Sequence, residues 1–277
     1  MDRRRFFGGL SAVAASLMWT GRAFAQDLPR SVPVPGGVAV VKLGPAGTPP
    51  RARFDGERVM VAGQPSEWLA VVGIPLSAQA GRKLPLRVER KGRAPETILV
   101  AVAPKEYATQ HLTVKPEQVD LSPQDLARYE RERAHLANVR KTYTATAPAS
   151  LLLVNPCDGE RSNSFGKRRF FNGQPRSPHN GMDIAAPEGT PIVAAGAGRV
   201  LDVGDYFFSG HTITLDHGRG FLTLYAHLSA VEVQQGAPVA AGSPIGRVGA
   251  TGRVTGPHLH LSVFLNAVAV DPELFLT

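Results

Sequence analysis

The sequence predicts a mainly β protein, with a small β-sandwich-like N-terminal domain, a helical connector and a C-terminal antiparallel β-sheet domain. Short apolar or alternating runs recur in both halves of the chain, and glycine-rich turns separate them. Helical periodicity is confined to one stretch in the middle. The length of 277 residues exceeds the usual size of one domain and favours two globular parts.

The first 25 residues have the pattern of a cleavable export signal. Three arginines at 3–5 precede an apolar run at 8–20, and small residues at 23–25 suit cleavage by a signal peptidase. The first two arginines resemble a twin-arginine signal, whereas three basic residues also suit the general export route. The apolar run is too short to span a bilayer stably. We therefore expect a periplasmic or secreted protein with no transmembrane segment after cleavage.

The composition is that of an ordinary soluble globular protein, with 43% hydrophobic and 19% charged residues. Removal of the signal, which holds four arginines and one aspartate, lowers the formal net charge from +8 to +5. The basic residues are scattered, so nucleic acid is not expected as a partner. The single cysteine, Cys157, excludes an intrachain disulfide, and no pattern around it indicates a nucleophile.

Residues 26–116 are predicted to form the N-terminal domain. Turn residues such as Gly44-Pro45 and Asp55-Gly56 separate short β-type runs, as in a small antiparallel sandwich. The predicted strands are 38–43, 58–62, 68–74, 84–90 and 97–102. No cluster of candidate catalytic groups falls within them.

A connector and linker follow at 117–150, with a helix predicted over 121–141. Ser122 suits the N-cap, Pro123 the first helical position and Asp125 the first turn. The charge density of this helix predicts a mostly solvated surface, with His135 exposed. An Ala-Pro-rich stretch at 142–149 then leads into the second domain.

Residues 151–277 return to a β pattern, with strands predicted at 191–195, 199–203, 211–216, 221–228, 244–248 and 258–265. Strict alternation in 221–228 places His227 with Tyr225 on one face, opposite Leu222 and Leu224. His211 and His217 are expected to be structural, because His217-Gly-Arg-Gly suits a hairpin turn.

The last strand carries a possible metal site. His258 and His260 alternate with leucines, so both imidazoles project from one face. His179 and Asp183 lie four residues apart, and an extended segment also presents such a pair on one side. Each pair alone also fits an ordinary polar surface or loop. Two histidines and one carboxylate that converge would leave one zinc coordination position open.

Four motifs in order carry a resemblance to a known family. They are Ser164-Phe-Gly-x-Arg168-Arg169, His179-x-Gly-x-Asp183, Tyr225-Ala-His227-Leu and Gly256-Pro-His258-Leu-His260. Together they resemble the lysostaphin-type, or LytM-type, zinc metallopeptidases over roughly residues 160–270. The resemblance is not distinctive over 26–150.

The resemblance implies one zinc ion bound by His179, Asp183 and His260, with His227 and His258 as catalytic residues. His258 would act as general base on the attacking water, and His227 would stabilise the tetrahedral intermediate. The assignment of the base stays open between these two histidines. Arg168 and Arg169 either line the cleft or lie in a solvated turn.

The resemblance and the export signal together predict a zinc endopeptidase that cuts the peptide cross-links of peptidoglycan, with its stem peptides as partner. Two alternatives are a non-catalytic regulator of cell-wall amidases and a secreted protease acting on proteins. A third, a lipoyl-type carrier module, is excluded because no lysine follows Lys167. The bond that is cut, protein partners and the role of the N-terminal domain are not readable from the sequence.

Overall fold

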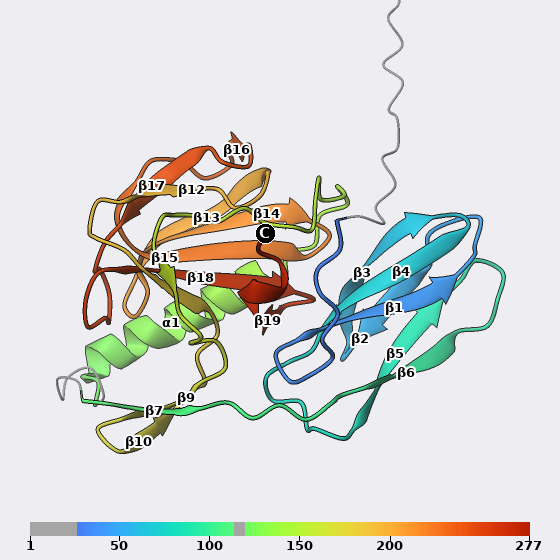
Figure 1. Ribbon diagram of the computed structural model, residues 1–277, viewed down its shortest axis with the longest axis horizontal. Helices are drawn as coiled ribbons and strands as arrows, with labels where there is room; N and C mark the ends of the chain where they lie inside the picture. The colour runs from blue at the N-terminus through green and yellow to red at the C-terminus, as the bar shows by residue number, and fades with distance from the viewer. Residues whose placement is uncertain (1–26, 114–119) are drawn as a thin grey trace, which may run out of the picture.

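The computed structural model describes residues 27–113 and 120–277. The predicted export signal and the predicted domain boundary near residue 116 lie outside these ranges. Two sheets lie side by side in Figure 1, and α1 crosses the C-terminal one. The mainly β architecture expected from the sequence is confirmed. Among the described helices, none is both long and apolar enough to cross a membrane.

The N-terminal strands form one antiparallel sheet with the order β1-β4-β3-β2-β5-β6. Alternation defines its faces: Ala52 and Phe54 point into the core, whereas Arg51 and Arg53 point outward. β2, the shortest of these strands, was not predicted from the sequence. The bounds are β1 (Val38–Gly44), β2 (Arg51–Phe54), β3 (Glu57–Gln64), β4 (Glu67–Gly73), β5 (Lys83–Glu89) and β6 (Glu96–Ala101).

The chain after β6 runs across to the C-terminal part (Figure 1). There β7 (Thr109–Leu112) pairs in parallel with β9 (Arg168–Phe171), which pairs in turn with β10 (Gln174–Arg176). This three-stranded sheet joins residues that are distant in sequence. Segment 109–112 therefore lies next to the C-terminal part of the chain, although it is distant from it in sequence.

The expected helix is α1 (Pro123–Arg140), and its Ser122 hydroxyl accepts a hydrogen bond from the Asp125 amide at 3.1 Å. None of its residues is fully buried. Even so, the helix is fixed to the C-terminal sheet. His135 Nε2 lies 2.8 Å from Asp202 Oδ1, and Glu132 accepts from the Phe207 amide at 2.7 Å. His135 is exposed and the helix is largely solvated, as predicted, and in addition the helix is docked on the C-terminal sheet.

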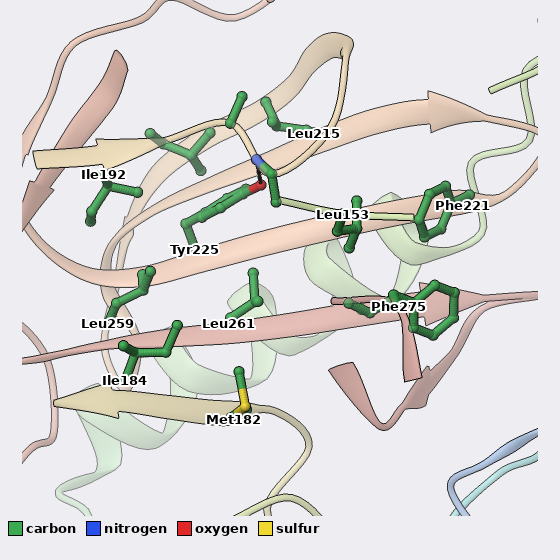
Figure 2. Close-up of a cluster of buried hydrophobic side chains, with 14 of the residues drawn as sticks. Leu153, Met182, Ile184, Ile192, Leu215, Phe221, Tyr225, Leu259, Leu261 and Phe275 are labelled. Carbon is green, nitrogen blue, oxygen red and sulfur yellow. Dashed lines mark hydrogen bonds between the residues drawn. The ribbon is translucent and has the colours of Figure 1, made fainter. Parts of the chain in front are cut away.

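The C-terminal strands form a ten-stranded sheet around the path β16-β13-β14-β15-β18-β11-β8. Its core is lined by the leucine face of β18, as the alternation predicted, and by apolar side chains of the neighbouring strands (Figure 2). The bounds are β8 (Glu160–Arg161), β11 (Met182–Ala185), β12 (Pro191–Val193), β13 (Gly198–Tyr206), β14 (Gly210–Gly218), β15 (Phe221–Val231), β16 (Pro238–Val239), β17 (Pro244–Val248), β18 (His258–Leu265) and β19 (Val268–Val270), followed by the 3-10 helix η3 (Pro272–Leu274).

The predicted alternation of β15 is wrong at His227. Tyr225 points into the core, where its hydroxyl accepts the Ala195 amide at 2.8 Å, as the dashed line in Figure 2 shows. Leu224, on the opposite face, lines the same cavity as His227. The reason is local: His227 has φ +68°, in the left-handed region, which changes the direction of its side chain relative to the regular pleat.

The two sheets are joined by buried polar contacts. The side-chain amide of Asn266, in the turn between β18 and β19, accepts from the Gly73 amide at 2.7 Å and donates to the Gly73 carbonyl at 3.0 Å. Val38 and Val71 of the N-terminal sheet belong to the same apolar cluster as the C-terminal core. The sheets thus share packing as well as hydrogen bonds.

Candidate metal and catalytic site

Strand register brings the carboxylate and one imidazole together. β11 pairs antiparallel with β18, and Asp183 lies directly opposite His260 in that pairing. Side chains at opposed positions share a face of the sheet, so both groups project to the same side. His260 Nδ1 lies 3.0 Å from Asp183 Oδ1. The Ser262 hydroxyl lies 2.9 Å from His260 Nε2, which orients the ring with Nδ1 toward the carboxylate.

The other imidazole comes from the segment that precedes β11. His179 Nδ1 lies 3.1 Å from the Ser164 carbonyl, and because a carbonyl can only accept, Nδ1 carries the proton. The unprotonated Nε2 is left facing the other two groups, 2.9 Å from His260 Nδ1 and 3.2 Å from Asp183 Oδ1. The Ser164 hydroxyl also accepts from the Asp183 amide at 3.0 Å.

The electrostatics of these groups favour a cation between them. Burial lowers the pKa of His179 to about 4, so its imidazole is neutral at pH 7. Burial alone would raise the pKa of Asp183, but the neighbouring His179 and His260 side chains hold it well below its usual range. A lone pair of His179 and a carboxylate oxygen therefore meet at 3.2 Å with no proton to share. Such a convergence of acceptors is the signature of a metal site.

The donor set also fits zinc in size. Zinc bonds to imidazole nitrogen and carboxylate oxygen are about 2.0 to 2.2 Å long, which places the ligand atoms of a tetrahedral site about 3.3 Å apart. Here the three separations are 2.9, 3.0 and 3.2 Å. His179, Asp183 and His260 also form a metal-compatible group by the proximity of their donor atoms. Two nitrogens and one oxygen are a typical zinc donor set.

Two further histidines lie beside this group. The His227 and His258 ring centroids are 4.9 Å apart, and His227 lies 5.9 Å from the His260 ring. Each places Nδ1 close to a backbone carbonyl, that of Thr251 at 2.8 Å for His227 and that of Gly256 at 2.9 Å for His258. Nδ1 is the protonated nitrogen in both, so both Nε2 atoms are available as proton acceptors.

The five groups open into a cavity of about 320 Å³. α1 supplies one wall with Leu136, Val139 and Arg140, and β7 supplies Gln110 and Leu112. Neither contribution was foreseen, because a helix with so many charges gave no apolar stripe to read and the pairing of β7 with β9 is long-range. The remaining walls include Arg169, Phe171, Phe208, Arg253 and Phe264.

Two serines beside the donors were also missed as site residues. Ser262 shares the outward face of β18 with His258 and His260, so the alternation could have identified it. Ser164 lies within the Ser-Phe-Gly motif, but nothing in the sequence shows that its carbonyl faces a histidine. Arg169 lines the cavity 3.7 Å from Asp183, whereas Arg168 is exposed.

Three other residues have structural surroundings. His217 is buried, with Nδ1 2.8 Å from the Ala197 carbonyl and Nε2 2.8 Å from the Thr223 hydroxyl, as a structural role requires. Cys157 is buried, and burial raises the pKa of its thiol to about 11, which suppresses the reactive thiolate. Burial likewise raises the pKa of Tyr225 to about 12. None of the three lines the cavity.

Comparison with family models gives two matches. Residues 177–272 match peptidase family M23, and residues 31–105 match the peptidase family M23 N-terminal domain. The first range contains the three candidate ligands and both neighbouring histidines. The second covers the N-terminal sheet, over which the motif resemblance is not distinctive.

Comparison with individual proteins finds relatives that are named as endopeptidases. The peptidoglycan DD-endopeptidase ShyA of Vibrio cholerae is 40% identical over 111 residues, which are 40% of this chain and 26% of that protein. The DD-carboxypeptidase/endopeptidase Mpg of Neisseria meningitidis is 46% identical over 94 residues, 34% of this chain and 22% of that protein. The matched segment thus spans about a quarter of each relative.

One solved structure matches over nearly the whole chain. A Pseudomonas aeruginosa protein assigned to peptidase M23 superposes with a TM-score of 0.73 at 42% sequence identity. The match covers 88% of this chain and 94% of that one. The arrangement of N-terminal sheet, helix and C-terminal sheet is therefore shared with that protein.

Proposed function

Since the chain belongs to peptidase family M23, we propose that it is an exported, zinc-dependent endopeptidase that hydrolyses the peptide cross-links of peptidoglycan. The observation that supports the proposal most strongly is the triangle of donor atoms from the buried His179 and His260 and the partly buried Asp183, all three of which line the cavity. The activities named for the relatives from Vibrio cholerae and Neisseria meningitidis suggest the class of substrate.

The proposed metal ligands are His179 Nε2, Asp183 Oδ1 and His260 Nδ1. A zinc ion bound there would lower the pKa of a coordinated water and polarise a peptide carbonyl. The ionised Asp183 and the neutral His179 are already in the protonation states that a metal ligand needs. The intact donor set argues against the non-catalytic regulator.

We assign proton transfer to His258. Its Nε2 is a free acceptor and lies 3.7 Å from Asp183 Oδ1, so an imidazolium formed there would have a carboxylate close by. Its side chain is 20% exposed, enough to meet a substrate entering the cavity. After taking a proton from the attacking water, Nε2–H can donate it to the leaving amine.

His227 is assigned to the developing oxyanion, with one condition. Burial lowers its pKa to about 3, and its proton is on Nδ1, so Nε2 has no hydrogen to donate in the free protein at pH 7. To act there, Nε2 must take up a second proton from the solvent as the substrate binds. The negative charge that develops on the substrate oxygen would then compensate the positive charge of the His227 imidazolium.

Digestion of purified peptidoglycan by the mature protein tests the proposed function. Mass spectrometry of the released fragments should show cross-linked dimers converted to monomers, with the free termini identifying the bond that was cut. The His258→Ala protein should bind zinc as the wild type does and cleave about 100 to 10,000 times more slowly. Persistence of every dimer with the zinc-loaded wild-type protein would refute the proposal.

Export is a separate part of the proposal and has its own test. A full-length chain should be recovered from the periplasm or medium, and a chain lacking residues 1–25 should remain in the cytoplasm. Replacement of Arg3 and Arg4 by lysine distinguishes the routes, because the twin-arginine pathway reads that pair and a general basic segment does not. Cytoplasmic retention of the unaltered chain would contradict export.

A further inference from the structure

A second cavity, of about 490 Å³, lies where the N-terminal sheet meets the segment after α1 and the β14–β15 turn. We call it the arginine cavity. It shares no lining residue with the candidate metal site. Its charged lining consists of five basic residues and one acid: Arg51, Arg53, Arg58, Arg87, Arg219 and Glu89. Tyr143 and Ala145 form part of its wall.

Strand register sets three of these arginines in a row across the sheet. Arg53 on β2 lies directly opposite Arg58 on β3 and directly opposite Arg87 on β5. All three are on the outward face, and all are exposed. Like charges at directly opposed positions destabilise a sheet, because their Cβ atoms are only about 5 Å apart. The row of three arginines therefore lowers the stability of the N-terminal sheet, so folding alone does not explain it.

Contacts among the described residues neutralise little of this charge. Glu89 is the one carboxylate on the lining; it pairs with Arg87 Nε at 3.3 Å and lies opposite Arg51 in the register. The other contacts are to neutral groups: Arg53 donates to the Gly56 carbonyl at 2.9 Å and Arg219 to the Val61 carbonyl at 2.8 Å. Since a guanidinium carries five N–H donors, most N–H donors of the five lining arginines have no partner among the described residues and can bind a ligand.

The shape of the cavity adds to the effect of the charges. Arg58 lies over the Tyr143 ring, with 3.9 Å from its Cζ to the ring centroid, which fixes one guanidinium on the wall. Arg219 is held in a tight turn with φ +50° and reaches the N-terminal sheet from the other side. A concave wall of one sign of charge focuses the electric field more strongly than a flat surface does.

We propose that the arginine cavity binds an anionic ligand that carries phosphate or carboxylate groups. Guanidinium groups bind both oxyanions with paired, charge-assisted hydrogen bonds, and several arginines around one concavity suit a ligand with more than one negative charge. Arg219 lies two residues before β15, and His227 lies within that strand eight residues further on, which corresponds to about 25 Å of extended chain, so this is a separate site. A peptide stem or a phosphorylated compound supplies such groups.

Isothermal titration calorimetry of the mature full-length chain at low salt tests the proposal, with inorganic phosphate and a peptidoglycan stem tetrapeptide as probes. The wild type should bind at least one of the probes saturably, with one probe molecule per chain, and 0.5 M salt should weaken this binding. Binding of phosphate alone would identify a phosphorylated ligand, and binding of the tetrapeptide alone a carboxylate ligand. Neither readout depends on hydrolysis, so failure of the proposed function would be seen separately.

The Arg53→Gln/Arg87→Gln protein should bind at least tenfold more weakly. Its matched control is Arg82→Gln/Arg93→Gln, which removes the same charge from exposed turn positions on either side of β5 that do not line the cavity. Removal of the opposed charges should leave the unfolding midpoint unchanged or higher, and the single Arg87→Gln protein gives the same comparison if the double variant does not fold. Equal weakening in variant and control, or no saturable binding by the wild type, would overturn the proposal.

Discussion

Ser262 illustrates how a hydroxyl behind a ligand can set the properties of a metal site. It holds His260 through Nε2 at 2.9 Å, on the side of the ring opposite the donor nitrogen. Loss of such an outer contact typically lowers metal affinity by about 10 to 100 times. We expect this loss in Ser262→Ala, measured by competition with a zinc-binding dye, with cleavage restored at saturating zinc.

Thr214→Val is the matched control for that measurement. Thr214 lines the same cavity and is buried, and its hydroxyl has no hydrogen-bond partner among the residues that the structure describes. Its replacement therefore keeps the shape and removes nothing that holds a ligand. Its zinc affinity should equal that of the wild type. An equal loss in both variants would mean that the cavity as a whole, and not the His260 contact, sets the affinity.

His217 predicts how folding stability depends on pH. Burial lowers its pKa to about 4, whereas an unfolded histidine has a pKa near 6.5. The unfolded chain therefore binds the proton more readily between these values, so stability is fully present above about pH 6.5 and is lost as the pH falls toward 4. The loss is on the order of 3 kcal/mol.

Urea unfolding of the metal-free protein between pH 4.5 and 7.5 measures this effect. The His217→Gln protein keeps a donor for the Ala197 carbonyl but cannot titrate, so the steepness of its pH dependence should fall relative to the wild type. Identical curves for the two proteins would show that other groups, and not His217, cause the acid sensitivity.

The turn between β18 and β19 joins the two sheets through one side chain. Asn266 makes two buried hydrogen bonds to Gly73 and has φ +38°, a conformation that asparagine tolerates better than most residues. We expect Asn266→Ala to lower the free energy of unfolding by about 2 to 4 kcal/mol, because both Gly73 groups lose their partner in a buried place. Chemical denaturation measures the change.

Asp55→Ala is the control for Asn266→Ala, because it separates the effect of backbone strain from the effect of the lost hydrogen bonds to Gly73. Asp55 also has a positive φ, +49°, but it is exposed in a turn of the N-terminal sheet. Its replacement should cost about 1 kcal/mol or less. If the two variants lost the same stability, the contact with Gly73 would contribute nothing.

The elements differ in how far the sequence determines them. β18 was predicted with the correct faces, because its leucines alternate strictly and the backbone stays regular. β15 has the same kind of pattern, but the left-handed φ of His227 breaks it, and the sequence -Tyr-Ala-His-Leu- gives no sign of this. α1 was predicted from its cap, whereas its docking depends on partners such as Asp202 that only the fold brings near.

The whole chain shows the same division. Its mainly β class was predicted from short alternating runs and glycine-rich turns, and the five proposed site residues came from four local motifs. The shape of the cleft was not, because its walls come from segments 109–112 and 123–140, which reach the C-terminal sheet by long-range pairing and docking. The arginine row likewise depends on register: nothing in the sequence shows that Arg53 lies between Arg58 and Arg87.

Zinc titration of the metal-free protein, with bound zinc and dimer cleavage measured on the same samples, tests whether the three donors and hydrolysis belong together. Cleavage should rise in proportion to bound zinc and reach its maximum at one ion per chain. The His260→Ala protein should lose both the tight binding and the cleavage, since it removes one of three ligands. Full cleavage without zinc, or tight zinc binding by His260→Ala equal to that of the wild type, would contradict the proposed site.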